Sequence, residues 1–309
     1  MAENTVDITK LVQKLSKRGP HHVLCGDLQY AGLPGKVYTP AEGTALPAVA
    51  FGHDWMTGVH RYHLTFKHLA SWGIVVAAPD TEKGFNPDHD GFAMDLHTAI
   101  DVLAGVRLGH GKITVSPGKL GIIGHGMGGG CAVLAASRRS DLRAVAALYP
   151  AATNPDSYVA ARSVRTKGLV IGSSEDQIIS AGDPAKLAQN WTGDVVYREI
   201  KGGTQNGFAE GIVTRALMGM GLPQHAQQER ARALLTGFLL ATLDEQHKYD
   251  AFTNDHSEAK KVETFTKGSL IALGDNLALR HRGSGPLLGS VDNPLTNSPL
   301  AANKLPFGR

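Results

Sequence analysis

The sequence predicts an α/β fold, built from a mainly parallel, twisted sheet with helices on both faces. The first observation behind this prediction is that short apolar runs alternate with helical segments through most of the chain, as in sheets with helical crossovers. The second is the composition of the runs at 46–52, 74–78 and 120–124, which are almost entirely apolar or small. Runs of this kind are typical of parallel strands that are buried on both faces.

The expected elements are separated by turn residues. Gly19-Pro20 ends a short N-terminal helix, the turn at 32–35 separates two short strands, and Gly73 ends a longer helix. In chain order we expect a helix within 1–20; strands at 21–29, 36–39 and 46–52; a helix at 59–72; a strand at 74–78; a helix at 91–106; a strand ending at 124 and a helix after it; strands at 144–149 and 168–172; a helix at 185–191; a strand at 195–200; and a helix at 229–243.

The helix expected at 59–72 is amphipathic. Its apolar face comprises Tyr62, Phe66, Leu69 and Ala70, which recur at helical spacing and predict core positions. His63 and His68 fall off this face. We therefore expect both histidines at solvent or at an interface.

The sequence divides into an N-terminal helical segment at 1–20, an α/β domain at 21–245 and a C-terminal extension at 246–309. Within the extension, 281–309 is rich in proline and lacks periodicity, so regular structure is not expected there. It is nevertheless too apolar for a free linker. The large apolar side chains are Leu287, Leu288, Leu295, Leu300, Leu305 and Phe307. We expect this tail to pack on its own domain or on a neighbouring subunit, as in a homo-oligomer or a complex with a protein partner.

Composition excludes several classes of protein. The 309 residues carry a formal net charge of only +3, without a dense basic run, so nucleic-acid binding is not expected. Two cysteines, Cys25 and Cys131, do not make a disulfide framework. No apolar run approaches the roughly 18 residues of a transmembrane helix. The first residues lack the basic and apolar regions of a signal peptide, and we expect a soluble, cytoplasmic protein.

The stretch at 119–134 is the organising feature of the chain. A strand ends at Gly124, the backbone turns through His125-Gly126-Met127, and a helix begins with three more glycines. The stretch has the frame of the nucleophile elbow, G-x-S-x-G, in which a serine is lifted above the sheet. It also satisfies the dinucleotide pattern G-x-G-x-x-G. Position 126, where the elbow has its nucleophile, is glycine.

The dinucleotide alternative lacks its usual supporting features. A dinucleotide site normally has an acidic residue about 20 residues further on, at the end of the next strand. The next strand here ends at 147–150 without an acid, and about three buried strands precede the glycine loop instead of none. We therefore expect no nicotinamide or flavin cofactor. No histidine spacing typical of metal sites is present, and we expect no metal.

The order of motifs resembles the α/β-hydrolase family, and within it dienelactone hydrolases, cutinase-type polyester hydrolases and chlorophyllases. The likeness is carried by the segments 69–76 and 124–130 and by the Gly52-His53-Asp54-Trp55 loop, and it covers about 20–245. The resemblance implies an α/β-hydrolase fold. It also implies a catalytic triad, in which a serine attacks an acyl carbon, a histidine takes its proton and an acid orients the histidine.

The triad implied by the resemblance is incomplete. Asp176 occupies the position of the family acid, although a solvated loop carboxylate is the alternative interpretation. Gln205 falls where the histidine should be, and an amide cannot act as a general base near neutral pH. Gly126 has no side chain to act as nucleophile. Because two positions are lost independently, natural loss is favoured over an engineered Ser-to-Gly trap.

The oxyanion pocket could persist, because its donors are backbone N–H groups. The resemblance assigns them to Met127 and to Asp54 or Trp55. His53 could face the cleft, whereas His125 is expected to be buried.

Two function classes remain open from the sequence. The first is a non-catalytic relative that acts as a binding or assembly subunit, with a small acyl or ester-like ligand in the cleft above Gly126. The second is a hydrolase of esters or related acyl compounds with a non-standard or disabled site. The empty nucleophile position favours the first.

Overall fold

The computed structural model describes residues 5–173, 182–211 and 223–272. The chain divides after Ile271 into two units, and the second, Ala272–Arg309, lies almost wholly outside the described residues. The tail at 281–309 therefore falls outside them as well, and its expected packing stays a prediction. The first unit, Met1–Ile271, contains all the elements described below.

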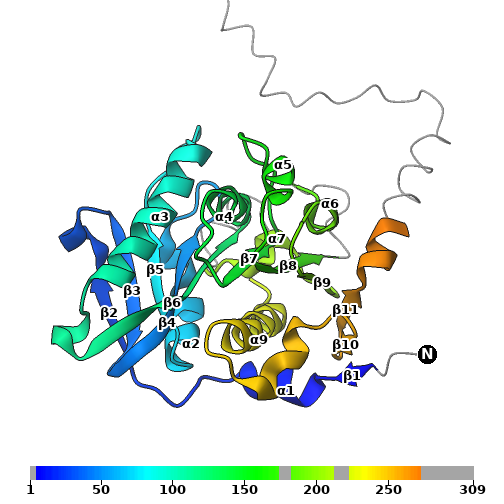
Figure 1. Cartoon of the computed structure of the whole chain (residues 1–309), viewed down its shortest axis with the longest axis horizontal. Coiled ribbons are helices and arrows are strands. Elements are labelled where there is room, and N and C mark those ends of the chain that lie inside the picture. The colour runs from blue at the N-terminus through cyan, green and yellow to red at the C-terminus, as the bar shows by residue number, and fades with distance from the viewer. Residues whose placement is uncertain (1–4, 174–181, 212–222, 273–309) are drawn as a thin grey trace, which may run out of the picture. The chain divides into compact units, whose positions relative to one another are not determined.

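A nine-stranded sheet forms the centre of the first unit, in the order β11-β9-β8-β7-β6-β4-β5-β3-β2 (Figure 1). Six neighbouring strands, from β5 to β9, are parallel, while β2, β3 and β11 pair antiparallel at the two edges. The predicted α/β-hydrolase fold is confirmed. The strands are β2 (Val23–Asp27), β3 (Gly35–Pro40), β4 (Gly43–Gly52), β5 (Val75–Pro79), β6 (Ile113–His125), β7 (Ala144–Leu148), β8 (Lys167–Ser173), β9 (Val195–Ile200) and β11 (Val262–Phe265).

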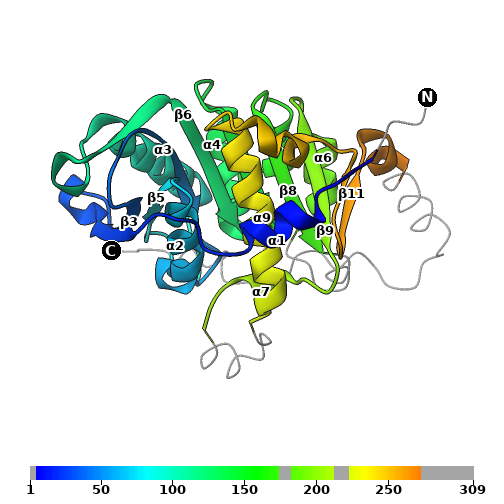
Figure 2. The ribbon, with the colours of Figure 1, turned by 90° about the horizontal axis from the view of Figure 1, so that it is seen from below.

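Helices cover the sheet in two layers (Figures 1 and 2). One layer comprises α3 (His89–Gly105), α4 (Met127–Ser137), α5 (Ser157–Ala161) and α6 (Pro184–Gln189), and the other comprises α1 (Thr9–Leu15), α2 (His63–Ser71) and α9 (His225–Thr242). Helix α4 is buried on every side from Met127 to Ala136, so it lies in the core. None of the helices in the described part of the chain is long and apolar enough to cross a membrane.

The histidines of α2 differ from each other in their surroundings. His63 is partly exposed and lies 2.8 Å from the Tyr38 hydroxyl through its Nδ1. His68 is only 4% exposed, so of its two expected positions, at solvent or at an interface, the position at solvent was wrong. The apolar face of α2 contacts the sheet, but α9 also packs beside this helix, and the end of α1 reaches His68 through the Leu15 carbonyl. Periodicity within one helix cannot show that a second helix covers its polar side.

The described part of the C-terminal extension adds one strand to the central sheet and one to a separate two-stranded sheet. The 3-10 helix η5 (His247–Thr253) packs against α9, the short strand β10 (Ser257–Glu258) pairs with β1 (Val6–Asp7), and β11 pairs with β9. These elements are too short for a periodic signal, and their pairing partners are distant in sequence. They are held to the sheet by Arg198 of β9, which is fully buried and donates to the carbonyls of Ala251, Phe252 and Asn254.

Candidate active site

The turn between β6 and α4 has the geometry that its glycines permit. Gly126 has φ 55° and ψ −121°, a conformation that is strained for residues with a side chain. Two residues on, Gly128 lies so close to β4 that a Cβ there would overlap the Gly52 carbonyl. The close approach brings the N-terminus of α4 against the carboxyl ends of β4 and β6. Backbone N–H groups therefore point into the space above Gly126.

The carboxylate of Asp54 fills this space. Its Oδ1 accepts hydrogen bonds from the Met127 N–H at 2.9 Å and from the Trp55 N–H at 2.8 Å. A Cβ placed on Gly126 would overlap the Asp54 carboxylate. The side chain is only 13% exposed, and it meets the positive end of α4. Thus the two N–H groups expected to bind an oxyanion converge on a carboxylate from the same protein.

Gln205 holds the second oxygen of this carboxylate. It opens the short helix α7 (Gln205–Phe208), and its Nε2 donates to Asp54 Oδ2 at 3.1 Å. The residue before it, Thr204, caps α7 by accepting the Gly207 N–H, and Gln224 accepts the Thr204 N–H. The structure therefore brings Gly126, Asp54 and Gln205 together. Gln205 acts there as a hydrogen-bond donor.

His125 and Tyr62 form the buried floor of the site. The Tyr62 oxygen accepts the Asp54 N–H at 3.0 Å and lies 2.8 Å from His125 Nδ1, to which it donates in the tautomer that carries the ring proton on Nε2. His125 Nε2 then carries a proton and donates to the Gln205 carbonyl at 3.0 Å. The Asp54 N–H is thereby engaged by Tyr62, and of the two alternatives in that loop only Trp55 directs its N–H at the space above Gly126. Both His125 and Tyr62 are fully buried, as expected.

The remaining candidates lie elsewhere or outside the described ranges. His53 does not face the cleft: it is fully buried, its ring nitrogens lie 2.9 and 2.7 Å from the carbonyls of Asp54 and Thr81, and burial lowers its pKa. Cys131 is buried in α4, and burial raises the pKa of its thiol. Asp176 falls within 174–181, which is outside the described residues, so its role as the acid stays a prediction.

Sequence reasoning missed the side chain of Asp54, because it assigned only a backbone role to this loop. One signal was available: an acidic residue beside the expected oxyanion donors in a chain whose nucleophile is glycine. A carboxylate is the natural occupant of a backbone nest at a helix N-terminus.

Comparison with known proteins agrees with this geometry. A family model described as "PETase: PET hydrolase-like" matches residues 13–206, which is more than half of the chain. The chain belongs to the PET hydrolase-like family. The resemblance to cutinase-type polyester hydrolases is thereby confirmed.

Several curated relatives of this PET hydrolase-like protein carry hydrolase names. It is 27% identical over 186 residues to "Cutinase est2" of Thermobifida alba, covering 59% of this chain and 60% of the relative. It is 30% identical to "Cutinase 2" of Thermobifida cellulosilytica, covering 59% and 68%, and 34% identical to "Lipase 1" of Moraxella sp. (strain TA144), covering 45% and 40%. The chain thus spans about 60% of the length of the first of these relatives.

Proposed function

We propose that this PET hydrolase-like protein binds a small acyl or ester-like ligand at the Asp54 site and does not turn it over by serine-hydrolase chemistry. The observation that carries the proposal is the position of the Asp54 carboxylate, which accepts both the Met127 and the Trp55 N–H groups. An ester carbonyl needs these same donors when its oxygen gains negative charge. A ligand that reaches them must displace Asp54, and it then meets glycine where a nucleophile would stand.

The proton chemistry of the site leads to the same proposal. The Gln205 amide donates to Asp54 and cannot accept a proton from water or an alcohol near neutral pH. His125, the nearest imidazole, uses one nitrogen for Tyr62 and the other for the Gln205 carbonyl. Neither residue is therefore poised as a general base.

A second candidate function is favoured by the family and by the names of the relatives, which are cutinases and a lipase. In this second candidate function, the chain is an ester hydrolase that uses Asp54 as its nucleophile. Oδ2 of Asp54 would attack the acyl carbon, the alcohol would leave with a proton from solvent, and water would cleave the mixed anhydride to regenerate the carboxylate. The position of the carboxylate directly above Gly126 supports this candidate. The absence of a poised base in the described site weighs against it.

The first prediction separates the two candidates. Purified full-length protein is expected to show no saturable hydrolysis of short p-nitrophenyl esters and no labelling by a fluorophosphonate, because triad chemistry accounts for roughly 10⁶-fold in kcat. Calorimetric titration with a non-activated ester, such as ethyl benzoate, is expected to show binding without product.

The variant Asp54→Asn serves as the control, since it keeps the shape of the side chain. Wild-type turnover that is lost in this variant would favour the Asp54 nucleophile and would contradict our main proposal. Turnover that persists in it would place the nucleophile elsewhere.

We also propose that the tail at 281–309 mediates assembly, with a second copy or a partner protein. Burying one large apolar side chain contributes roughly 1.5–3 kcal/mol, while ordering an extended segment costs about 1–2 kcal/mol per residue. The tail therefore needs a preformed groove.

The cytoplasmic location of the protein stays a prediction as well.

Truncation after His281 is expected to leave the domain folded but to lower its assembly state. Light scattering at matched concentrations measures the assembly state, and circular dichroism checks folding. Equal assembly states for two folded proteins would remove the assembly role.

A further inference from the structure

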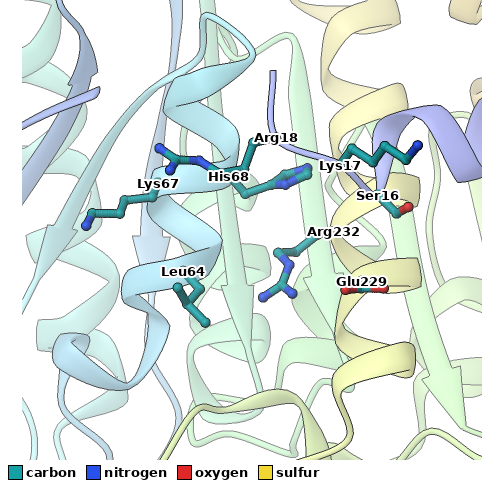
Figure 3. A pocket seen from close by; sticks show the side chains of 8 residues that line it. All are labelled: Ser16, Lys17, Arg18, Leu64, Lys67, His68, Glu229 and Arg232. Carbon is teal, nitrogen blue, oxygen red and sulfur yellow. The ribbon is translucent and has the colours of Figure 1, made fainter. Parts of the chain in front are cut away.

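A cavity lies on the face of the sheet that α1, α2 and α9 cover, and it shares no residue with the Asp54 site. Its volume is about 540 Å³. Figure 3 shows Lys67 and His68 projecting from α2, Arg232 and Glu229 from α9, and Lys17 and Arg18 from the segment after α1. Four of these six side chains are cationic at neutral pH and one is acidic, so the cavity is strongly positive.

Two of the lining side chains are buried, and each has a nitrogen atom without a hydrogen-bond partner among the described residues. Arg232 is 8% exposed and His68 is 4% exposed. Arg232 Nη1 and His68 Nε2 are both inaccessible and make no hydrogen bond within the described part of the chain. A buried polar group without a partner is costly, and a buried charge more so. A ligand with acceptor atoms in the cavity can supply the missing partners.

The acidic residues nearby do not neutralise this cluster. Among the described residues, none of Lys17, Arg18, Lys67 and Arg232 forms an ion pair. Glu210 lies within electrostatic range of Arg232, but its carboxylate accepts the backbone N–H groups of Leu64 and Thr65. The four cationic side chains at the cavity therefore outnumber the two nearby carboxylates, those of Glu229 and Glu210.

We propose that this cavity binds the phosphate group of a small organic phosphate monoester, with Arg232 and His68 as the buried ligands and Lys17, Arg18 and Lys67 around the entrance. A phosphate monoester carries about two negative charges near pH 7, which matches the excess of cations. The planar fork of an arginine binds phosphate oxygens in pairs. One water needs only about 10–15 Å³ of such cavity volume, so about 540 Å³ is far more than the five heavy atoms of one phosphate require. The cavity therefore has space for the organic part of the ligand. The proposal is independent of the function of the Asp54 site.

The titration of His68 provides a second indication. Burial, with Arg232 and Arg18 nearby, lowers the pKa of His68 to about 4, although the Leu15 carbonyl opposes the shift. His68 is thus neutral at pH 7 in the free protein, and Nε2 can accept a proton only if negative charge arrives. A bound phosphate supplies that charge and raises the pKa of His68, so binding and protonation reinforce each other.

The test uses full-length protein and inorganic phosphate as the probe, with sodium chloride at matched ionic strength to remove general salt effects. Calorimetry is expected to give saturable binding, and Arg232→Gln is expected to weaken it roughly tenfold to a hundredfold, as for loss of charge-assisted hydrogen bonds. The matched control is Arg230→Gln, on the same helix, where the arginine donates to the Ala226 carbonyl and to no other group in the described part of the chain. It makes the same change in charge and is expected to leave binding unchanged.

Glycerol phosphate is expected to bind more tightly than inorganic phosphate. Binding to vesicles that contain phosphatidic acid, without binding of either soluble probe, would overturn the small-molecule proposal. So would saturable binding of citrate alone, or equal binding by wild type and Arg232→Gln.

If Arg232→Gln does not fold, the double variant Lys17→Gln/Lys67→Gln tests the same charge cluster at more exposed positions. A spectroscopic readout is independent of affinity: in NMR titrations, phosphate is expected to move the His68 pKa upward from about 4, with the signal assigned through His68→Gln. A His68 pKa that does not respond to saturating phosphate would contradict the site.

Discussion

The double variant Gly126→Ser/Gln205→His is expected to remain inactive on p-nitrophenyl esters, whereas the triple variant that adds Asp54→Ala gains measurable esterase activity. The reason is steric. A Cβ at position 126 overlaps the Asp54 carboxylate, and the Met127 and Trp55 N–H groups are engaged by that carboxylate. Removing the carboxylate frees both the serine position and the oxyanion donors, and the histidine then supplies the base. We expect a kcat/KM roughly 10³-fold above the background hydrolysis that the double variant shows, well below that of an intact enzyme.

Asp54→Ala in the wild-type background is the matched control, because it opens the same space without a nucleophile. It is expected to stay inactive. Labelling by a fluorophosphonate distinguishes a serine that reacts from one that is merely present. A folded triple variant that is neither labelled nor active would contradict the proposed frame, including Asp176 as the acid. Activity in the double variant would show that Asp54 moves aside without cost.

The fold was predictable because its signals are local and repeated. Each parallel strand is a short apolar run, as at β5 and β7, and each crossover helix has turn residues beside it. The glycines around Gly126 also predicted a tight turn and a close approach to a strand, and Gly128 lies against Gly52 as such a motif requires. By contrast, β10 and β11 have two and four residues, which is too few for a period, and their positions depend on partners far away in the chain.

The site was only partly predictable, because the sequence locates backbone donors better than it locates side chains. The N–H groups of Met127 and Trp55 lie where the motif placed them. What binds to them could not be read from the motif, since it depends on the rotamer of Asp54. In the same way, the burial of His68 depends on α9 and on the Leu15 carbonyl at the end of α1, which come from distant parts of the chain.

Replacement of Arg198 by methionine is expected to lower the free energy of unfolding by roughly 4 kcal/mol, the largest stability effect that we predict for a single substitution. The guanidinium is fully buried and donates to three carbonyls, to Ser257 Oγ at 2.6 Å and to Thr264 Oγ1 at 3.3 Å. Burial lowers its pKa to about 10, so the charge is retained at pH 7. Methionine fills a similar volume but removes the guanidinium donor from the carbonyls of Ala251 and Phe252, while the Asn254 carbonyl keeps the Ser257 hydroxyl as a donor.

Urea denaturation, followed by circular dichroism, measures the change. The control is Arg143→Met, because Arg143 pairs with Glu245 at the surface, where both side chains are more than half exposed, and such pairs contribute at most about 1 kcal/mol. Arg198→Lys keeps the charge, but one ammonium has three donors for five acceptors, so an intermediate loss is expected. Equal stabilities for Arg198→Met and Arg143→Met would show that water satisfies the carbonyls of η5. In that case Arg198 would not be what holds η5 and β10 to β9.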